Sequence, residues 1–373
     1  MNKKIYLASP HMMGKEREYV TEAFDTNWIA PLGPFVNKFE DYFKDYFNLK
    51  GACALSSGTS ALHLAIKLAG VKQGDVVFCS SLTFSASANP ITYEGGVPVF
   101  IDSEPETYNM SPEALEKAFE KYPNPKAVII VSLYGMPAKY DELIKICKKH
   151  NTVVIEDAAE SLGSTYEGKK VGTFGDYSII SFNGNKIITT SGGGMLLTKD
   201  EEKAKHALKL ATQSREPERW YEHKEIGYNY RMSNVCAAIG CAQFEKLEDK
   251  INLKRNIFNR YVDGFKDIKE IEMLVEPANM LSTHWLSIMK IKNSKVKPID
   301  INETLEKENI EARHIWKPMH LQPVFEHCDF FMHGNEKAIC EELFESGVCL
   351  PSDTNMTKDE QEKIIKIITK MFK

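Results

Sequence analysis

Lys186 lies in a stretch whose residue types could support covalent chemistry, because residues 181–195 read SFNGNKIITTSGGGM. Apolar residues flank it, with YSII before the stretch and two isoleucines directly after the lysine, so a solvated position is not expected. A lysine reacts covalently where burial or a neighbouring cation lowers its pKa. Taken alone, the stretch favours a β-hairpin with Lys186 at its tip and the glycine run at a bulge. A reactive lysine needs support from the rest of the chain.

A carboxylate, Asp157, follows the apolar run 153–155. Burying a carboxylate without a partner is costly, so Asp157 needs one. A backbone amide or an arginine would make it a structural residue, whereas the cationic ring nitrogen of a cofactor would make it a functional one. These residues alone leave both possibilities open.

Small hydroxyl residues form the stretch 56–60, SSGTS, between an apolar segment and a helical pattern. The N-terminus of a helix presents free N–H groups and a positive dipole end, which together hold a phosphate. The alternative is that the serine or threonine simply caps the helix. The motif predicts an anion site but is weak on its own.

The elements around these residues alternate between strands and helices. We predict strands at 52–55, 75–79, 97–101, 127–131, 152–155 and 177–182, and helices at 15–26, 35–47, 61–69, 111–121, 140–150, 200–210 and, as one long helix, 233–265. Strands that are apolar throughout and separated by helices indicate a parallel sheet covered on both faces. Ligands bind at the carboxyl ends of such strands, where Ser57–Thr59, Thr83–Phe84, Tyr134 and Asp157 should converge.

The amino-acid composition limits the classes of protein to which the chain can belong. The 373 residues are 43% hydrophobic and 27% charged with a net charge of −5, which favours two unequal domains and gives no support for a nucleic-acid partner. No apolar run has the length of a membrane span, and the start, MNKKIYLASP, has no signal-peptide core. The eight cysteines show no metal-ligand spacing, so we expect no metal site and a reduced, cytoplasmic protein.

The motifs in their order resemble fold-type I pyridoxal-phosphate (PLP) enzymes, and among them the sugar aminotransferase family named after DegT. The resemblance runs over nearly the whole chain, through NWIAPLGPFVNKFE, SSGTSALHLA, EDAAESLGS, SFNGNKIITT, GYNYRMSN and KPMH. It implies an α/β fold with a PLP-binding large domain at 1–245, including the N-terminal segment, built on a mostly parallel central sheet flanked by helices. A smaller C-terminal α+β domain is expected at 246–373.

The resemblance also implies roles for individual residues. Lys186 resembles the Schiff-base lysine, Asp157 the partner of the pyridinium nitrogen, and Phe84 the residue stacked on the ring. The cofactor is expected to contact Ser57, Gly58, Thr59, Phe84, Asp157, Glu160, Ser181, Asn185, Lys186 and, supplied by the second subunit of a homodimer with shared active sites, Asn229. The substrate is expected to contact Ile29, Tyr134, Arg231, Lys317 and His320.

Three positions depart from the usual family pattern. Glu160 stands where the family has glutamine, near the cofactor's phenolic oxygen. The common TTGEGG is TTSGGG here, and Ser132 replaces a histidine. The first two departures, with the asparagines of SFNGNK, resemble the branch of the bacillosamine pathway that makes UDP-4-amino-4,6-dideoxy-N-acetylglucosamine.

The expected function is therefore amination, with glutamate as donor, of C4 in a UDP-linked 4-keto-6-deoxy-N-acetylhexosamine. A first alternative is another nucleotide-linked ketosugar, carried by dTDP or GDP and aminated at C3 or C4. A second is a PLP-dependent sugar dehydratase, although those relatives have histidine in place of the lysine. A third is a non-catalytic PLP-binding regulator, which an intact Lys186 and Asp157 disfavour. No membrane partner is expected.

Overall fold

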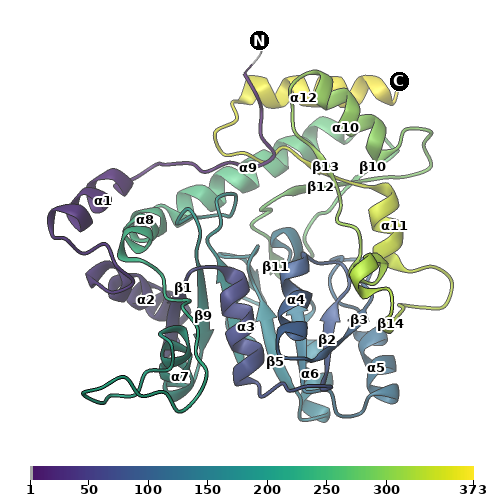
Figure 1. Ribbon diagram of the computed structural model, residues 1–373. Helices are drawn as coiled ribbons and strands as arrows, with labels where there is room; N and C mark the ends of the chain where they lie inside the picture. Colours follow the sequence, from purple (N-terminus) through teal and green to yellow (C-terminus); the bar gives the residue numbers. More distant parts are fainter. Residues whose placement is uncertain (1–2) are drawn as a thin grey trace.

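The computed structural model describes residues 3–373, and a mixed eight-stranded sheet forms its centre (Figure 1). The strand order is β1 (Gly51–Leu55), β9 (Gly194–Thr198), β8 (Tyr177–Ser181), β5 (Val153–Asp157), β4 (Ala127–Val131), β2 (Val76–Ser80), β3 (Val97–Ile101) and β14 (Phe330–Phe331). Strand β9 runs antiparallel to both of its neighbours, and all other pairs are parallel. The α/β fold with a mostly parallel sheet is therefore confirmed.

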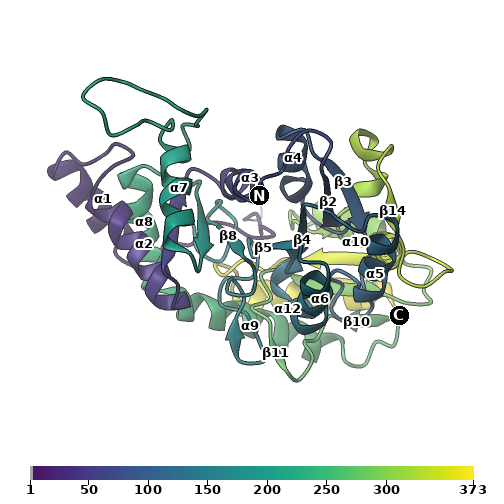
Figure 2. The same cartoon turned by 90° about the horizontal axis from the view of Figure 1, so that it is seen from below.

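Helices cover both faces of this sheet, as Figure 2 shows for α3 and α4 on one side and α5 and α6 on the other. The helices are α1 (Glu16–Asp25), α2 (Pro34–Phe47), α3 (Gly58–Leu68), α4 (Ser85–Tyr93), α5 (Pro112–Lys121), α6 (Tyr140–Lys149), α7 (Glu201–Ala211) and α8 (Asn234–Phe244). In β4, Val128 and Ile130 belong to one core, whereas Ala127 and Ile129 belong to the core on the other face. Burial on both faces explains why these strands are apolar throughout.

The C-terminal part contains a smaller antiparallel sheet. Its strands are, in order, β10 (Ile271–Met273), β12 (Ser287–Ile291), β15 (Gly347–Leu350) and β13 (Arg313–His314). A separate core forms between this sheet and the helices α9 (Leu247–Phe265), α10 (Pro298–Lys307) and α12 (Lys358–Met371). The remaining short elements are η1 (Leu133–Gly135), β6 (Thr165–Tyr166), β7 (Lys169–Lys170), β11 (Met280–Leu281), η2 (Met319–Leu321), η3 (Pro323–Phe325) and α11 (Ile339–Ser346).

Two segments cross the domain boundary expected between residues 245 and 246. Near the N-terminus, Ile5 packs into the C-terminal core and forms a parallel bridge with Ile310. In the other direction, β14 adds to the edge of the large sheet beside β3. The two parts are therefore interlocked at both ends of the chain.

One expectation about helices was wrong, and one helix was not predicted. The helix expected over 233–265 is two helices, because the chain leaves helical geometry at Lys246 (φ −111°, ψ 13°) between α8 and α9. The polar stretch after β2 contains the unexpected helix α4, which carries Pro90 in its interior. Among residues 3–373, no helix combines the length and apolar character that a membrane crossing requires.

Candidate active site

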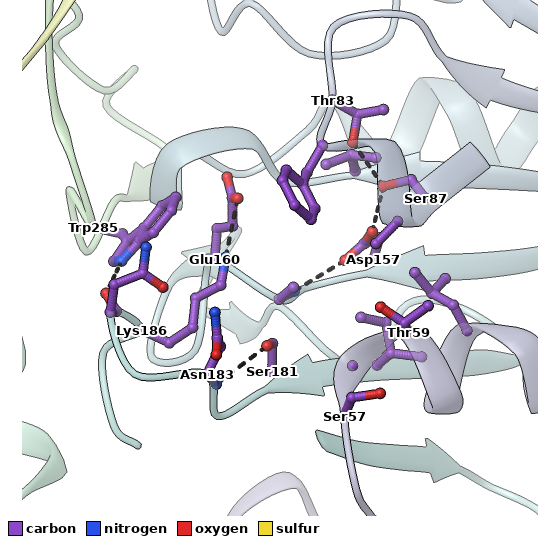
Figure 3. Close-up of a pocket in the computed structure, with 18 of the residues that line it drawn as sticks. Ser57, Thr59, Thr83, Ser87, Asp157, Glu160, Ser181, Asn183, Lys186 and Trp285 are labelled. Atoms are coloured by element: carbon purple, nitrogen blue, oxygen red, sulfur yellow. Dashed lines mark hydrogen bonds and ion pairs between the residues drawn. The ribbon is translucent and has the colours of Figure 1, made fainter. Parts of the chain in front are cut away.

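A cavity of about 340 Å³ lies at the carboxyl ends of the large-sheet strands. The large sheet contributes the turns after β1 and β2, the end of β5 and the loop between β8 and β9, whereas the C-terminal part contributes Trp285, Arg313 and Trp316. The register aligns Val131, Asp157 and Ile179 across β4, β5 and β8, so their strand ends meet at one edge. Figure 3 shows the polar side chains that face one another there.

Lys186 lies in the loop of a β-hairpin, because β8 and β9 pair antiparallel on either side of residues 182–193. Its amide donates to the carbonyl of Asn183 (3.0 Å), and its side chain enters the cavity. The Nζ atom lies 3.2 Å from Oε1 of Glu160 and 3.9 Å from the centroid of the Trp285 ring. The hairpin is confirmed and is compatible with a lysine held in a partly buried site, but the glycine run does not form a bulge, because the register of β8 and β9 is unbroken up to Ser181 and Gly194.

Asp157 ends β5 and is 5% exposed. Its Oδ2 accepts a hydrogen bond from Ser87 Oγ (2.7 Å), which also bonds Thr83 Oγ1 (2.7 Å), and its Oδ1 accepts from the amide of Ala159 (3.2 Å). Burial raises the pKa of Asp157, and these hydrogen bonds offset that effect only in part. No arginine is bonded to it among the described residues, so a cationic N–H group in the cavity would complete its environment.

Glu160 is the second buried carboxyl group of the cavity, 4% exposed. Oε1 faces Lys186, and Oε2 accepts from the amide of Tyr134 (2.7 Å). Burial raises its pKa, while the charge of Lys186 acts in the opposite direction. Lys186 therefore lies against a carboxyl group in this protein, at the position where glutamine was noted as usual.

The start of α3 forms the end of the cavity expected to bind an anion. Ser57 caps the helix, since its Oγ accepts from the amide of Ser60 (3.0 Å), and Ser57, Gly58 and Thr59 all line the cavity. The chain packs tightly here, because a Cβ atom on Gly194 would lie 2.3 Å from the carbonyl oxygen of Ser57. Helix capping and a position suited to anion binding thus occur together.

Of the other expected cofactor contacts, Phe84, Ser181 and Asn185 also line the cavity. The Phe84 ring is 57% exposed and lies 5.5 Å from the Trp316 ring. A Cβ atom on Gly58 would lie 3.1 Å from Cβ of Ser181, so only a small residue fits between α3 and β8. The cavity therefore brings together every expected cofactor residue except Asn229.

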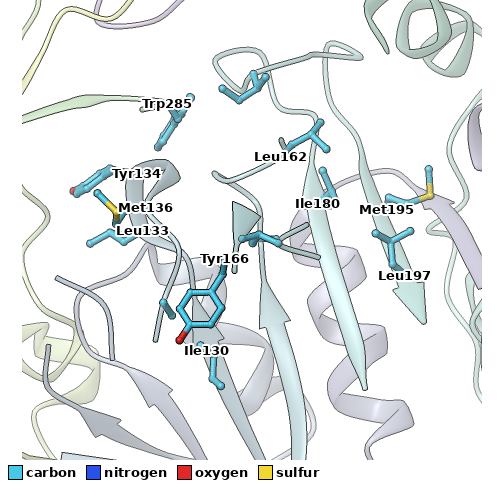
Figure 4. Close-up of a cluster of buried hydrophobic side chains, with 14 of the residues drawn as sticks. Ile130, Leu133, Tyr134, Met136, Leu162, Tyr166, Ile180, Met195, Leu197 and Trp285 are labelled. Atoms are coloured by element: carbon cyan, nitrogen blue, oxygen red, sulfur yellow. The ribbon is translucent and has the colours of Figure 1, made fainter. Parts of the chain in front are cut away.

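In contrast to the cofactor residues, none of the five expected substrate contacts lines the cavity. Tyr134 is 1% exposed, and its hydroxyl oxygen accepts from the amide of Trp316 (3.1 Å). Of Tyr134, only the backbone amide bonds a residue that lines the cavity, because it donates to Glu160. Tyr134 lies in the left-handed region (φ 55°), and its ring packs beside Trp285 (Figure 4). The expectation that its side chain converges with Asp157 was wrong.

Arg231 and His320 have protein partners instead. Arg231 is paired with Glu40 and donates to the carbonyl of Ala54 (3.2 Å), and its side chain is 8% exposed. The His320 ring bonds Ser81 Oγ (2.7 Å) and is 9% exposed. Both side chains therefore stabilise the wall of the large domain in this chain.

The other positions outside the cavity are exposed. Ile29 and Lys317 lie at the surface, and Asn229 is exposed in the segment between α7 and α8, where it bridges Thr212. A role for Asn229 in the site of a second subunit remains a prediction.

Several lining residues were not predicted. Ser87 lies on the unexpected α4, and Trp285, Trp316 and Arg313 come from the C-terminal part. Arg313 and Trp316 lie just before the motif KPMH, but only Lys317 and His320 of this region were expected in the site. Nothing local to Trp285 in the sequence marks it as a site residue.

The donor set fits PLP. The cavity offers an amine in Lys186, a buried carboxyl group in Asp157 to which no cation is bonded among the described residues, and the N-terminus of α3 with its hydroxyl groups. These are the partners required by an aldehyde, a protonated ring nitrogen and a phosphate, respectively. The three partners belong to separate elements of one sheet edge, so a single ring-containing molecule could contact all of them.

Comparisons with known proteins agree with this chemistry. The profile of the DegT/DnrJ/EryC1/StrS aminotransferase family matches residues 10–369. The chain is 52% identical to EpsN of Bacillus subtilis (strain 168), provisionally named a pyridoxal phosphate-dependent aminotransferase, over 100% of this chain and 97% of the relative. It is 36% identical to the GDP-perosamine synthase of Escherichia coli O157:H7, over 99% of each. It is 35% identical to the UDP-4-amino-4,6-dideoxy-N-acetyl-beta-L-altrosamine transaminase of Campylobacter jejuni, over 72% of this chain and 67% of the relative.

A solved structure extends the similarity to three dimensions. The PLP form of Spr1654 from Streptococcus pneumoniae, provisionally named a sugar aminotransferase, superposes with a TM-score of 0.90 at 25% identity and covers 100% of each chain. The family match spans nearly the whole sequence, and the cavity contains the groups that PLP requires. The chain therefore belongs to the DegT/DnrJ/EryC1/StrS aminotransferase family and is a PLP-dependent sugar aminotransferase.

Proposed function

We propose that this enzyme transfers an amino group from glutamate to C4 of a UDP-linked 4-keto-6-deoxy-N-acetylhexosamine, the reaction of the bacillosamine-type branch. The observation that carries the proposal is the position of Glu160. This residue departs from the common family pattern in the way that the branch does, and it lies in the cavity 3.2 Å from Lys186. A departure that touches the reactive amine bears on the chemistry rather than on the surface of the protein.

Each side chain has a defined task in this proposal. Bound PLP supplies a ring that accepts electrons from the carbon that loses a proton. Lys186 binds the cofactor covalently and, once released, moves the proton between the carbon atoms. Asp157 keeps the ring nitrogen protonated, and the amides and hydroxyl groups at the start of α3 hold the phosphate. Trp285, packed against Lys186, keeps water away from the amine.

A homodimer with shared active sites, located in the cytoplasm, is part of the proposal. The segment between α7 and α8 projects as a long loop beyond α7 (Figure 2). It exposes Trp220 (60%), Tyr221 (78%) and Ile226 (82%), and aromatic residues are enriched in subunit interfaces. Asn229 lies in the same segment and away from the cavity of its own chain, which supports a contribution to the neighbouring site.

Complementation tests this arrangement. A mixture of Lys186→Ala and Asn229→Ala subunits, each nearly inactive alone, should regain activity after subunit exchange, because one site per heterodimer then has both residues. Heterodimers that form, as shown by differently tagged subunits, and remain inactive would rule out the shared site.

A second candidate substrate is a GDP-linked ketosugar. It is favoured by the relative named GDP-perosamine synthase, which matches this chain over 99% of its length. The C. jejuni transaminase named for a UDP sugar matches only 72% of the chain. The overall similarity therefore does not separate the two nucleotides, and the assignment to UDP depends on the branch features.

The deciding experiment is a substrate panel. The purified enzyme, loaded with PLP, is incubated with glutamate and with UDP-, GDP- and dTDP-linked 4-keto-6-deoxy sugars, and the products are identified by NMR. We expect the UDP-linked N-acetyl sugar to be aminated at C4 with the highest kcat/KM. A preference for the GDP sugar would select the second candidate. Failure of glutamate alone to convert bound PLP to its amine form would contradict the choice of donor.

A further inference from the structure

Trp285 forms the side of the cavity that contacts the reactive lysine. Its ring centroid lies 3.9 Å from Nζ of Lys186, and its Nε1 donates to the carbonyl of Asn185 (2.6 Å). The indole therefore touches both the side chain of the lysine and the main chain directly before it. A cation–π contact with a tryptophan at this distance stabilises a charged amine.

The segment that carries Trp285 is not held by a sheet. Residues 282–286 lie between β11 and β12, and the amide of Leu286 reaches the carbonyl of Tyr134 only at 3.5 Å. His284 lies in the left-handed region (φ 46°). The position of the indole therefore depends on contacts from outside the segment.

Several parts of the chain supply those contacts. Ser282 Oγ donates to the carbonyl of Gly135 (2.9 Å), the amide of Thr283 donates to Ser164 Oγ (3.2 Å), and the His284 ring bonds Glu276 (2.7 Å). Helix α9 supplies three more contacts from one stretch of its surface. They are Lys254 Nζ to the carbonyl of Trp285 (2.9 Å), Arg255 Nη1 to the carbonyl of Ser282, and the ring of Phe258 stacked on that of His284 (3.5 Å between centroids, 5° between planes). Of these three, only the lysine bonds the residue that reaches the active site.

Lys254 is an unusual residue for this position. It is 4% exposed, and its second hydrogen bond goes to the carbonyl of Ser352 (2.6 Å), so both of its partners are neutral. Burial lowers its pKa to about 7, although the charge of Asp353 partly counteracts this. An apolar side chain would avoid the cost of burying an amine but could not bond two carbonyl groups from distant segments.

We propose that Lys254 is a positioning residue: by holding the carbonyl of Trp285, it keeps the indole against Lys186 and so sets the orientation and reactivity of that amine. The inference depends on the proposed function, in which Lys186 is the reactive amine. It assigns a role to a side chain on α9 that does not itself line the cavity.

The chain offers a matched control one helical turn earlier. Lys250 also lies on α9, is 3% exposed, and donates to the carbonyl of His11 (2.7 Å) and to Oε1 of Gln243 (2.6 Å). Burial lowers its pKa as well, to about 8. Among residues 3–373, neither of its hydrogen bonds goes to the segment 282–286, so its loss should reproduce the effect on stability without removing a bond to Trp285.

The test compares Lys254→Met with Lys250→Met, because methionine keeps much of the volume and removes the amine. In the cofactor-free protein, the rate at which acetic anhydride labels Lys186 is measured by peptide mass spectrometry. We expect Lys254→Met to change this rate about threefold, the equivalent of one cation–π contact, and Lys250→Met to leave it unchanged. In the PLP-bound enzyme, only Lys254→Met should shift the pH midpoint of the cofactor's visible absorption band.

A second variant covers the case in which Lys254→Met does not fold. Trp285→Phe keeps an aromatic ring but removes the bond to Asn185, so it disturbs the same contact from the other end and should also change the labelling of Lys186. Equal labelling rates in the wild type and the folded variants would overturn the proposal, as would equal changes in Lys254→Met and Lys250→Met. Because the labelling needs neither substrate nor cofactor, its result does not depend on the choice of sugar.

Discussion

The two walls of the cavity differ in how they are built. The wall from the large domain consists mostly of residues that flank regular elements, such as Asp157 at the end of β5 and Ser57 before α3, with Lys186 in the loop that joins β8 and β9. The wall from the C-terminal part consists of Trp285, Leu286, Arg313, Trp316 and Cys349, and all of these except Cys349 lie on short or irregular segments. The first wall carries the groups that react, and the second shapes the space in front of them. Substitutions on the first should therefore abolish chemistry, whereas those on the second should alter affinity.

The strongest test of this difference is Lys186→Ala. We expect turnover to fall by about 10³-fold or more, because the variant loses both the covalent attachment and the proton carrier. Borohydride reduction of the PLP-loaded wild type should fix the cofactor to Lys186, as shown by peptide mass spectrometry. Fixation on another lysine, such as Lys170, would contradict the assignment.

Asp157→Asn should have the next largest effect. The amide fills nearly the same volume but cannot stabilise a protonated ring nitrogen, and losing one charge-assisted hydrogen bond lowers kcat by about tenfold to a hundredfold. The thermal midpoint of the cofactor-free variant should stay close to that of the wild type. Turnover near the wild-type level would make Asp157 a structural carboxylate.

On the opposite wall, Arg313→Ala should change KM more than kcat. Within the described range 3–373, Lys186 and Arg313 are the only lysine or arginine residues that line the cavity, and both glutamate and a nucleotide sugar are anionic. The Arg313 side chain is 64% exposed and is paired with Glu311 (2.7 Å), so we expect a rise in KM of only about threefold to tenfold. Arg313→Lys should give an intermediate value. An equal loss in kcat would place Arg313 among the reacting groups and remove the difference between the walls.

The smallest expected effect concerns Glu160 and pH. In the cofactor-free protein, burial raises the pKa of Glu160 above its ordinary value of 4.5, so the native state holds this proton more tightly than the unfolded chain does. The stability contributed by this group therefore falls as pH rises from 4.5 through the raised value. Glu160→Gln removes this dependence on pH. As pH rises from 4.5 through the raised pKa, the thermal midpoint of the variant should therefore increase by about 2 °C relative to that of the wild type. Calorimetry from pH 4 to 8 measures the difference, and a constant gap would mean that the native and unfolded states bind this proton equally, so that burial does not raise the pKa of Glu160.

The difference between the two cavity walls also explains which site residues could be predicted from the sequence. Asp157 and the turn at Ser57–Thr59 were found because an apolar strand of known direction places its last residues at a known edge. Tyr134 also follows such a strand, but its left-handed backbone turns the side chain away from the cavity. Strand order places a residue at an edge without fixing where its side chain points.

Other contacts depend on pairings that no local pattern reveals. Arg231 was expected to bind substrate, but it meets Glu40, which is distant in the sequence and belongs to α2. Trp285 reaches Lys186 only because α9 holds its segment in place. The break between α8 and α9 also lacks a local signal, since the sequence there, FEKL, contains neither glycine nor proline.

The position of β9 has a consequence for the order in which the protein forms on the ribosome. Strand β1 lies at the edge of the large sheet, and β9 is its neighbour there, so β1 cannot join the sheet until residues 194–198 have been made. At translation rates of 5–20 residues per second, that delay is on the order of 10 s. The turn at residues 57–59 follows β1 directly, and Lys186 precedes β9. We therefore expect a nascent chain released before residue 198 to be unable to capture PLP, even though it already contains both the lysine and the phosphate-binding turn.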